Sequence, residues 1–131
     1  MRSKKTADAL FRPLSMQGAG SRRRAPPDEN PALEAMWHVV CAIPRGQVST
    51  YGAVARTAGF AGRARLAGFA LKVAPEGMNM PWHRVVGAGG RIVFPKTSRE
   101  HAEQTRRLRA EGVAVKDGRV PSAAMMLLEE L

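Results

Sequence analysis

The sequence has very few of the residues that build disulfide or metal frameworks. Its single cysteine, Cys41, excludes an intramolecular disulfide, and one cysteine with three histidines at unrelated spacings gives no zinc-ligand pattern. No apolar run approaches the roughly 20 residues that a membrane span needs, and the basic N-terminus lacks the apolar core of a signal peptide. The sequence therefore predicts a cytoplasmic protein without a bound metal or cofactor.

Acidic residues are also scarce, and the chain carries 21 Lys and Arg against 11 Asp and Glu, a net charge of +10. The excess occurs in both parts of the chain, with seven cations against three acids in residues 1–29 and fourteen against eight in residues 30–131. A basic globular surface favours polyanions, nucleic acid first and anionic membrane second. A solvated basic face without a partner is the alternative.

Composition divides the chain into three parts. Residues 1–29 mix charge with Gly, Ser and Pro, which predicts a disordered basic extension that either adds phosphate affinity or is inert. Residues 30–120 are expected to form one domain. Residues 121–131 are predicted to be a C-terminal tail, and its apolar run, residues 125–128, has no partner identifiable from the sequence.

Local patterns predict a mainly α domain with short β elements. Asn30 and Pro31 are typical of an N-cap and a first helical position, and the apolar spacing after them favours a helix that stops at Pro44. Cys41 lies in this helix and is expected to be a buried small hydrophobe. Further helices are expected at residues 51–58, 63–73 and 99–111, short strands at 85–86 and 91–94, a hairpin around 117–118, and a simple link at 47–50.

The second and third predicted helices are joined by a few residues that include glycine, which is typical of a helix-turn-helix. Along one side of the third helix lie Arg65, Gly68, Phe69 and Lys72, at the spacing i, i+3, i+4 and i+7. Two cations therefore flank a position without a side chain, where a backbone or a nucleic-acid groove can come close.

Four separated segments, IPRGQVSTYGAVA, ARLAG, PWHRVV and RLRAEGV, occur here in one order and spacing. Together they resemble the DNA-binding domain of the O6-alkylguanine-DNA alkyltransferases over about residues 31–120. In those enzymes the third segment is PCHRV-like, and its cysteine takes the alkyl group. Trp82 stands at that position here, which is the mark of the alkyltransferase-like proteins. The resemblance implies a winged helix-turn-helix-like domain of the alkyltransferase C-terminal type.

The resemblance also implies roles for individual residues. Tyr51 matches the tyrosine that rotates a nucleotide's phosphate, and Arg65 matches the arginine finger that fills the vacated base stack. Gly68 and Lys72 match the helix face that lies in the minor groove. Lys96 is the nearest match to a basic loop residue that probes the modified guanine.

Two further residues, His83 and Glu111, match the relay that activates the alkyltransferase cysteine. With Trp82 in place of that cysteine, their implied role is to hold the loop and the last helix together. The chain departs from the family at Ala74, where the asparagine hinge is expected, and at residues 94–97, where the Tyr-Ser-Gly-Gly loop is missing.

An indole offers no nucleophilic lone pair, so Trp82 cannot accept an alkyl group as a thiolate does. It can present a flat apolar wall to a flipped base. The predicted function is a monomeric, non-enzymatic sensor that binds O6-alkylguanine in double-stranded DNA and flags it for nucleotide excision repair proteins, without a membrane partner. Two alternatives are a helix-turn-helix transcription regulator and a residual alkyltransferase that uses Cys41.

Overall fold

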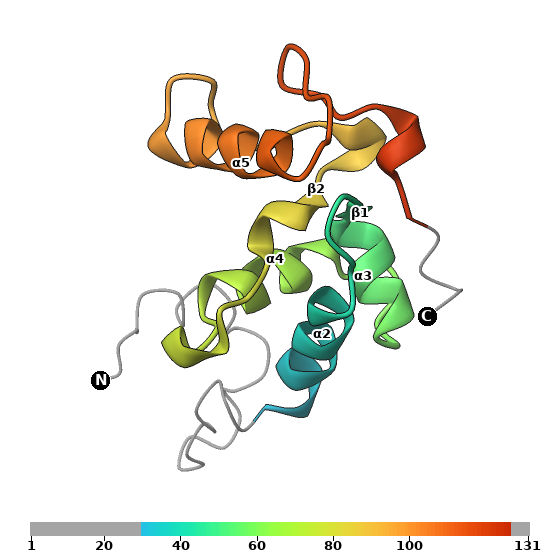
Figure 1. Cartoon of the computed structure of the whole chain (residues 1–131). Helices are drawn as coiled ribbons and strands as arrows, with labels where there is room; N and C mark the ends of the chain where they lie inside the picture. The colour runs from blue at the N-terminus through green and yellow to red at the C-terminus, as the bar shows by residue number, and fades with distance from the viewer. Residues whose placement is uncertain (1–29, 127–131) are drawn as a thin grey trace.

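The computed structural model describes residues 30–126, which form two groups of elements with a two-stranded sheet between them (Figure 1). One group contains the first three long helices, and the other contains the last long helix with the segments around it. In chain order the elements are α2 (Pro31–Cys41), β1 (Ser49–Thr50), α3 (Tyr51–Thr57), α4 (Ala64–Lys72), η2 (Glu76–Met78), η3 (Trp82–Arg84), β2 (Val85–Val86), η4 (Ala88–Gly90), α5 (Arg99–Ala110) and η5 (Ser122–Ala124), where η marks a single 3₁₀ turn.

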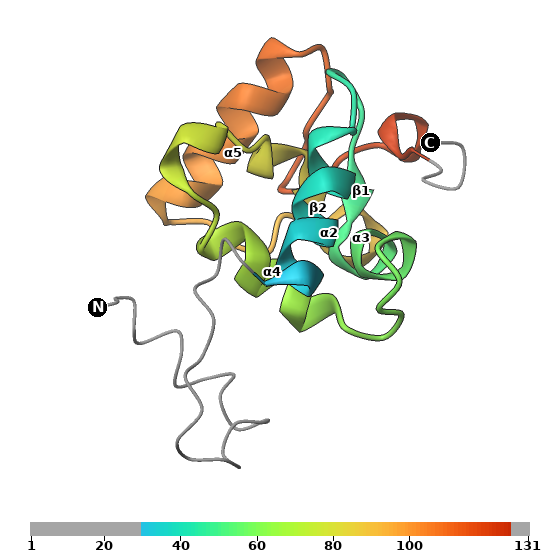
Figure 2. The ribbon, with the colours of Figure 1, turned by 90° about the horizontal axis from the view of Figure 1, so that it is seen from below.

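The predicted start of the first helix is confirmed. The Asn30 Oδ1 accepts hydrogen bonds from the N–H groups of Ala32 at 2.9 Å and Leu33 at 3.3 Å, and Pro31 occupies the first helical position. The helix ends at Cys41, three residues before Pro44. Figure 2 shows α2 grouped with α3 and α4. Trp37 ties two of these helices together, because its Nε1 donates a 2.7 Å hydrogen bond to the carbonyl oxygen of Ala70 in α4.

The second and third predicted helices are present as α3 and α4. The Thr50 hydroxyl accepts a hydrogen bond from the N–H of Ala53 at 3.0 Å and so caps α3. After α3 the chain turns at Gly59, whose φ of +98° is a conformation that glycine adopts readily. α4 buries Ala67 and Ala70, and these small side chains let it pack closely on its neighbours.

Residues 47–50 are more than the link that the sequence predicts. Ser49 and Thr50 form β1, which pairs in parallel with β2 in the register Ser49 with Val85 and Thr50 with Val86. Two residues are too few to show the alternation of polar and apolar side chains by which strands are recognised. The predicted strand at Val85–Val86 is confirmed, and both its residues are buried.

The α5 group confirms one expected element and corrects two. Ser98 caps α5, its Oγ accepting from the N–H of His101 at 3.1 Å. The strand expected at residues 91–94 is wrong, since only an isolated bridge joins Arg91 to Arg119 and Val93 is half exposed. The Asp117-Gly118 turn forms, with φ values of +50° and +74°, but its flanks make a single bridge and no strands.

The predicted burial of Cys41 is also wrong, because the residue is exposed. The buried positions of α2 are Leu33, Met36, Trp37 and Val40, and Cys41 lies just past this face in the last turn. Its thiol donates to the Met80 Sδ at 3.8 Å and lines a shallow open cleft between α2 and η2. Whether a small apolar residue at a helix end is buried therefore depends more on its position relative to the buried face than on its residue type.

The two ends of the chain, residues 1–29 and 127–131, lie outside the described part, and so does the predicted disorder of residues 1–29. Within the described part, residues 121–126 lie against the domain. The Val48 N–H donates to the carbonyl oxygen of Ala124 at 2.9 Å, and the Met126 N–H donates to the carbonyl oxygen of Val48 at 2.8 Å. The start of the predicted apolar run therefore has a partner in the segment that leads into β1.

Candidate nucleic-acid interface

One face of α4 is basic and open. Arg65 and Lys72 are exposed, and neither forms an ion pair or a side-chain hydrogen bond with any residue in the range 30–126. Gly68 lies between them at helical spacing, on the side opposite the buried Ala67 and Ala70. The structure thus brings three of the predicted DNA-binding residues together on one surface.

Gly68 has no internal steric reason to be glycine. A β-carbon built at this position would meet nothing within 4 Å, and its backbone conformation is an ordinary helical one. Glycine inside a helix is less stable than alanine by about 0.5–1 kcal/mol. The fold therefore gains nothing from the missing side chain, and open space lies beside the helix backbone at this position.

Tyr51, the first residue of α3, is half-buried against the core formed by α2, α3 and α4. Burial raises the pKa of its phenol, so the hydroxyl stays protonated and able to donate a hydrogen bond. The residue follows Thr50 directly, and Thr50 pairs with Val86 just after η3. The sheet therefore links the start of the helix-turn-helix to the Trp82 segment.

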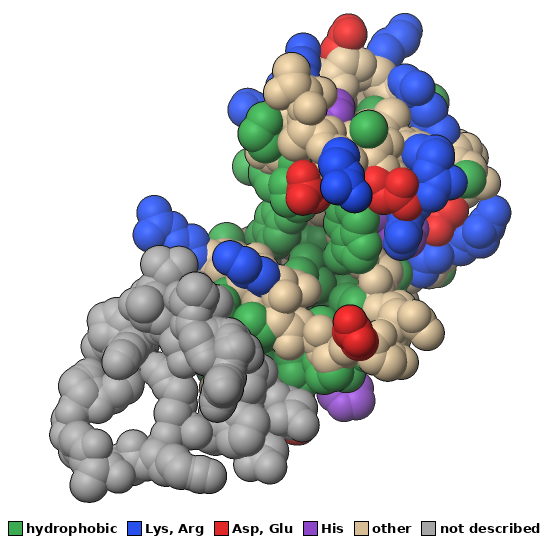
Figure 3. Space-filling view, turned by 90° about the vertical axis from the view of Figure 1, so that its left-hand side faces the viewer, with side chains coloured by type: hydrophobic (Ala, Val, Ile, Leu, Met, Phe, Trp, Pro, Cys, Tyr) green, Lys and Arg blue, Asp and Glu red, His purple; other side chains and the backbone are tan. Residues whose placement is uncertain are grey.

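Trp82 is the first residue of η3 and is half-buried. His83 and Phe94 lie at the edges of its ring, with centroids 6.2 and 6.1 Å away and interplanar angles of 86° and 89°. The Arg107 guanidinium lies over the ring, 5.5 Å from the centroid. The side facing the viewer in Figure 3 shows a band of hydrophobic side chains between the two groups of elements, with Lys and Arg side chains interspersed with Asp and Glu above it.

Glu111, which follows the last residue of α5, collects hydrogen bonds from three residues in two segments. Arg84 donates from Nη2 to Oε2 at 2.8 Å and from Nε to Oε1 at 3.1 Å, and the N–H of Gly46 donates to Oε1 at 3.0 Å. His83 Nε2 lies 2.8 Å from Oε2. Burial opposes ionisation, but the bonds from Arg84, Gly46 and His83 outweigh it and lower the pKa of Glu111 to about 2.

The tautomer of His83 follows from this contact. A carboxylate can only accept, so His83 Nε2 carries the proton, and the buried Nδ1 has no hydrogen-bond partner in residues 30–126. Burial lowers the pKa of His83 below its usual value; Glu111 acts in the opposite direction, and the charges of Arg84 and Arg107 add to the lowering. At neutral pH the ring is therefore uncharged.

Three residues that sequence reasoning gave no specific role support this site. The Gln104 Nε2 donates to the carbonyl oxygens of His83 and Val85, both at 3.0 Å, and so fixes η3 against α5. Arg84 also donates from Nη1 to the carbonyl oxygen of Ile43 at 2.8 Å. A signal for Gln104 was present, because it lies four residues before Leu108, and these two are the buried residues of α5. The position of Arg107 over Trp82 leaves no comparable pattern.

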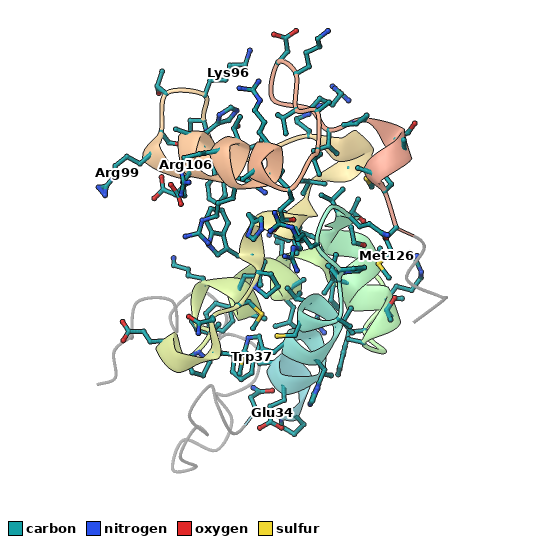
Figure 4. The ribbon with its side chains drawn as sticks, viewed as in Figure 1. Glu34, Trp37, Lys96, Arg99, Arg106 and Met126 are labelled. Atoms are coloured by element: carbon teal, nitrogen blue, oxygen red, sulfur yellow. The ribbon has the colours of Figure 1, made fainter. Side chains whose placement is uncertain are left out.

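The predicted residues thus fall into separate places. Trp82, His83 and Glu111 form one cluster, whereas Arg65, Gly68 and Lys72 form the open face of α4. Lys96 is exposed in the loop before α5, and Figure 4 places it on the side of α5 away from η3.

Within the described residues, no group of three or more His, Cys, Asp or Glu could hold a metal ion. None of the described helices is long and apolar enough to cross a membrane.

Known proteins resemble this chain in sequence and in fold. Residues 31–113 match the family described as 6-O-methylguanine DNA methyltransferase, DNA binding domain. A protein of Escherichia coli named DNA base-flipping protein is 48% identical over 80 residues, which span 61% of this chain and 60% of that protein. A Vibrio parahaemolyticus protein of the same name is 41% identical over 85 residues, which span 65% of this chain and 83% of that protein.

A solved structure extends the likeness to three dimensions. The crystal structure of Schizosaccharomyces pombe Atl1 in complex with damaged DNA containing O6-carboxymethylguanine is 33% identical, with a TM-score of 0.66 over 80% of this chain and 99% of that chain. A Mycobacterium tuberculosis O6-methylguanine methyltransferase variant reaches a TM-score of 0.50 at 27% identity, over 65% of this chain and 51% of that chain. The predicted fold, mainly helical with short strands and of the alkyltransferase DNA-binding type, is confirmed.

Proposed function

Since the chain belongs to the 6-O-methylguanine DNA methyltransferase DNA-binding domain family, we propose that it is a non-enzymatic sensor of O6-alkylguanine in duplex DNA. The observation that carries the proposal is Trp82, a half-buried indole beside His83 in the hexapeptide where the enzymes that this chain resembles hold their cysteine. The relatives named DNA base-flipping protein and the Atl1 complex with damaged DNA support it.

The energies involved allow recognition without chemistry. Turning a base out of a duplex costs a few kcal/mol, and less for a lesion that already pairs poorly. Stacking a base on an aromatic side chain contributes about 1–3 kcal/mol. Because the two magnitudes are similar, a weakly paired base is held against Trp82 while an intact one returns to the stack.

The face of α4 supplies the DNA contacts in this proposal. Arg65 enters the space that the flipped base leaves, Lys72 contacts phosphate, and Gly68 lets the duplex approach the helix backbone. Tyr51 begins the neighbouring helix α3 and has a protonated hydroxyl that can donate to a phosphate oxygen. Free, unpaired cations on an exposed helix suit a polyanionic partner.

Alkyl transfer is not part of the proposed function. The reaction needs a thiolate next to a base, and Cys41 makes its hydrogen bond with Met80, with no contact to His83 among the described residues. His83 and Glu111 then serve to hold η3 on α5. A lesion that is held but not repaired requires a further process, and we propose nucleotide excision repair as the recipient.

The proposal is tested by affinity for duplexes that differ at a single base. The protein is titrated with fluorescent duplexes containing guanine or O6-methylguanine at one position, at fixed salt because phosphate contacts make affinity salt-dependent. Tighter binding to the modified duplex is expected, and equal affinity for the two duplexes would contradict the proposed sensor function. In parallel, duplex with a labelled O6-methyl group is incubated with the protein and with Cys41→Ser; label on the protein that disappears in Cys41→Ser would show an alkyltransferase instead.

A further inference from the structure

Arg107 is held over the indole of Trp82 by a neighbouring carboxylate. Its Nε donates to the Glu103 Oε2 at 2.6 Å, one helical turn earlier in α5, and its guanidinium carbon lies 5.5 Å from the ring centroid. The same Glu103 oxygen accepts from Arg106 Nη2 at 2.6 Å. Glu103 therefore orients the guanidinium of Arg107 while it shares its charge between two arginines.

The charges around Trp82 do not cancel. Arg84 is neutralised by Glu111, and His83 is uncharged at neutral pH. Glu103 is one negative charge for the two positive charges of Arg106 and Arg107. One positive charge therefore remains beside the indole, and the side chain that brings it to the ring is Arg107, which is 42% exposed.

We propose that Arg107 makes the pocket selective for O6 substituents that carry an anion, such as a carboxymethyl group. This inference rests on the proposed function, in which the flipped base stacks on Trp82. A base stacked on the ring brings its substituent within reach of a guanidinium that already touches the same ring. A carboxylate there meets a planar cation with several N–H donors, the geometry in which arginine binds carboxylates best.

Lys96, which the resemblance makes the nearest match to a basic residue that probes the modified guanine, does not share this position over the ring. It lies in an exposed loop on the side of α5 away from η3 (Figure 4), and no contact joins it to Trp82. Arg106 is the better comparison, because it shares Glu103 with Arg107 but is 68% exposed and makes no contact with the indole. Comparing Arg107 with Arg106 therefore distinguishes the effect of a charge at the ring from the effect of a charge nearby.

The test uses two lesions that differ in charge and hardly in shape. Duplexes contain O6-carboxymethylguanine or the uncharged amide O6-carbamoylmethylguanine at one position, and the ratio of their Kd values is measured for the wild type, Arg107→Gln and Arg106→Gln. Because the ratio compares two lesions on one protein, a general loss of phosphate affinity cancels. A partly exposed ion pair contributes modestly, so we expect wild type to prefer the carboxylate about threefold.

The expected pattern is a ratio near one for Arg107→Gln and an unchanged ratio for Arg106→Gln. Both side chains are solvent-exposed to a large degree, so both variants should fold, which thermal unfolding verifies. A wild-type ratio retained by Arg107→Gln overturns the inference, as does an equal loss in Arg106→Gln or a wild type without preference between the two lesions. Wild type that binds neither lesion more tightly than guanine overturns the proposed function itself.

Discussion

Arg84 and Glu111 form a bidentate ion pair that joins the two groups of elements. Nη2 and Nε of Arg84 donate to the carboxylate at 2.8 and 3.1 Å, and both side chains are largely buried, at 17% and 6% exposure. Arg84 reaches the carbonyl oxygen of Ile43 after α2, whereas Glu111 ends α5 and receives the N–H of Gly46. The pair therefore fixes η3, with Trp82, between the ends of two helices.

Replacing Glu111 with glutamine should destabilise the fold strongly. The change leaves the buried cation of Arg84 without its counter-charge, which costs about 3–5 kcal/mol in comparable cases. Urea unfolding measures the loss. Glu103→Gln is the matched control, because it breaks two ion pairs with arginine on an exposed surface, and its effect should be small. A small loss in Glu111→Gln would mean that the pair has little structural weight.

Stability should fall steadily on the acid side of neutrality. The pKa of His83 is lower in the folded protein than in the unfolded chain, so the unfolded chain binds a proton first as pH falls below about 6.5, which disfavours folding. The pKa of Glu111 is also lowered, to about 2, so its contribution is present above the unfolded value near 4.5 and is lost between there and 2. Urea midpoints between pH 8 and pH 3 measure this. A midpoint that rises on acidification through pH 6 would contradict the described state of His83.

Gly68→Ala should separate stability from binding. Because a β-carbon at this position meets nothing, alanine should raise the free energy of unfolding by about 0.5–1 kcal/mol. If DNA lies against this face, the same methyl group should weaken affinity for every duplex, modified or not. Thermal unfolding and duplex titration give the two numbers. A more stable variant with unchanged affinity for DNA would show that this face of α4 is not part of the proposed interface.

Arg65→Ala should weaken affinity for the modified duplex by about ten- to hundredfold, because it removes the side chain that is proposed to stabilise the flipped state. Arg63→Ala is the matched control, because Arg63 is an exposed arginine two residues earlier, at the N-cap position of α4. The fluorescence of 2-aminopurine placed opposite or beside the lesion reports flipping directly. Equal behaviour of the two variants would reduce Arg65 to a general phosphate contact.

Trp82→Ala should lose about 1–3 kcal/mol of affinity for the modified duplex, whereas Trp82→Phe should lose less, because a smaller ring still stacks. Affinity for unmodified duplex should change little in either variant, since non-specific binding rests on phosphate contacts. Titration of both duplexes measures the difference. An alanine variant that keeps the wild-type preference would place the lesion away from the indole.

Local sequence signals explain why the helices could be predicted. Asn30 with Pro31 marks a helix start by a cap whose chemistry is local and which forms as expected, and Thr50 and Ser98 cap α3 and α5 in the same way. The short strands depend on partners far along the chain, so β1 went unpredicted and residues 91–94 were wrongly assigned. Pairing between distant segments leaves little trace in a run of two to four residues.

The residues of the candidate site also divide into those that local spacing predicts and those that tertiary packing decides. The face of Arg65, Gly68 and Lys72 follows from helical spacing alone, and the structure places the three together. The position of Arg107 over Trp82 depends on how α5 crosses η3, and that crossing is set by Gln104 and Glu111. The exposure of Cys41 likewise depends on where α2 ends against its neighbours. Tertiary packing decides these contacts.

The hydrogen bonds of Val48 with Ala124 and Met126 have a consequence for the open edge beside β1. β2 covers one edge of β1, and residues 124–126 pair with the backbone of Val48, which is fully buried. A chain cut after residue 120 would leave that donor and acceptor unpaired, next to the strand β1. Such an edge is a template for strand addition from a second molecule. The short C-terminal segment therefore occupies the backbone groups of Val48 through which a second copy could add a strand.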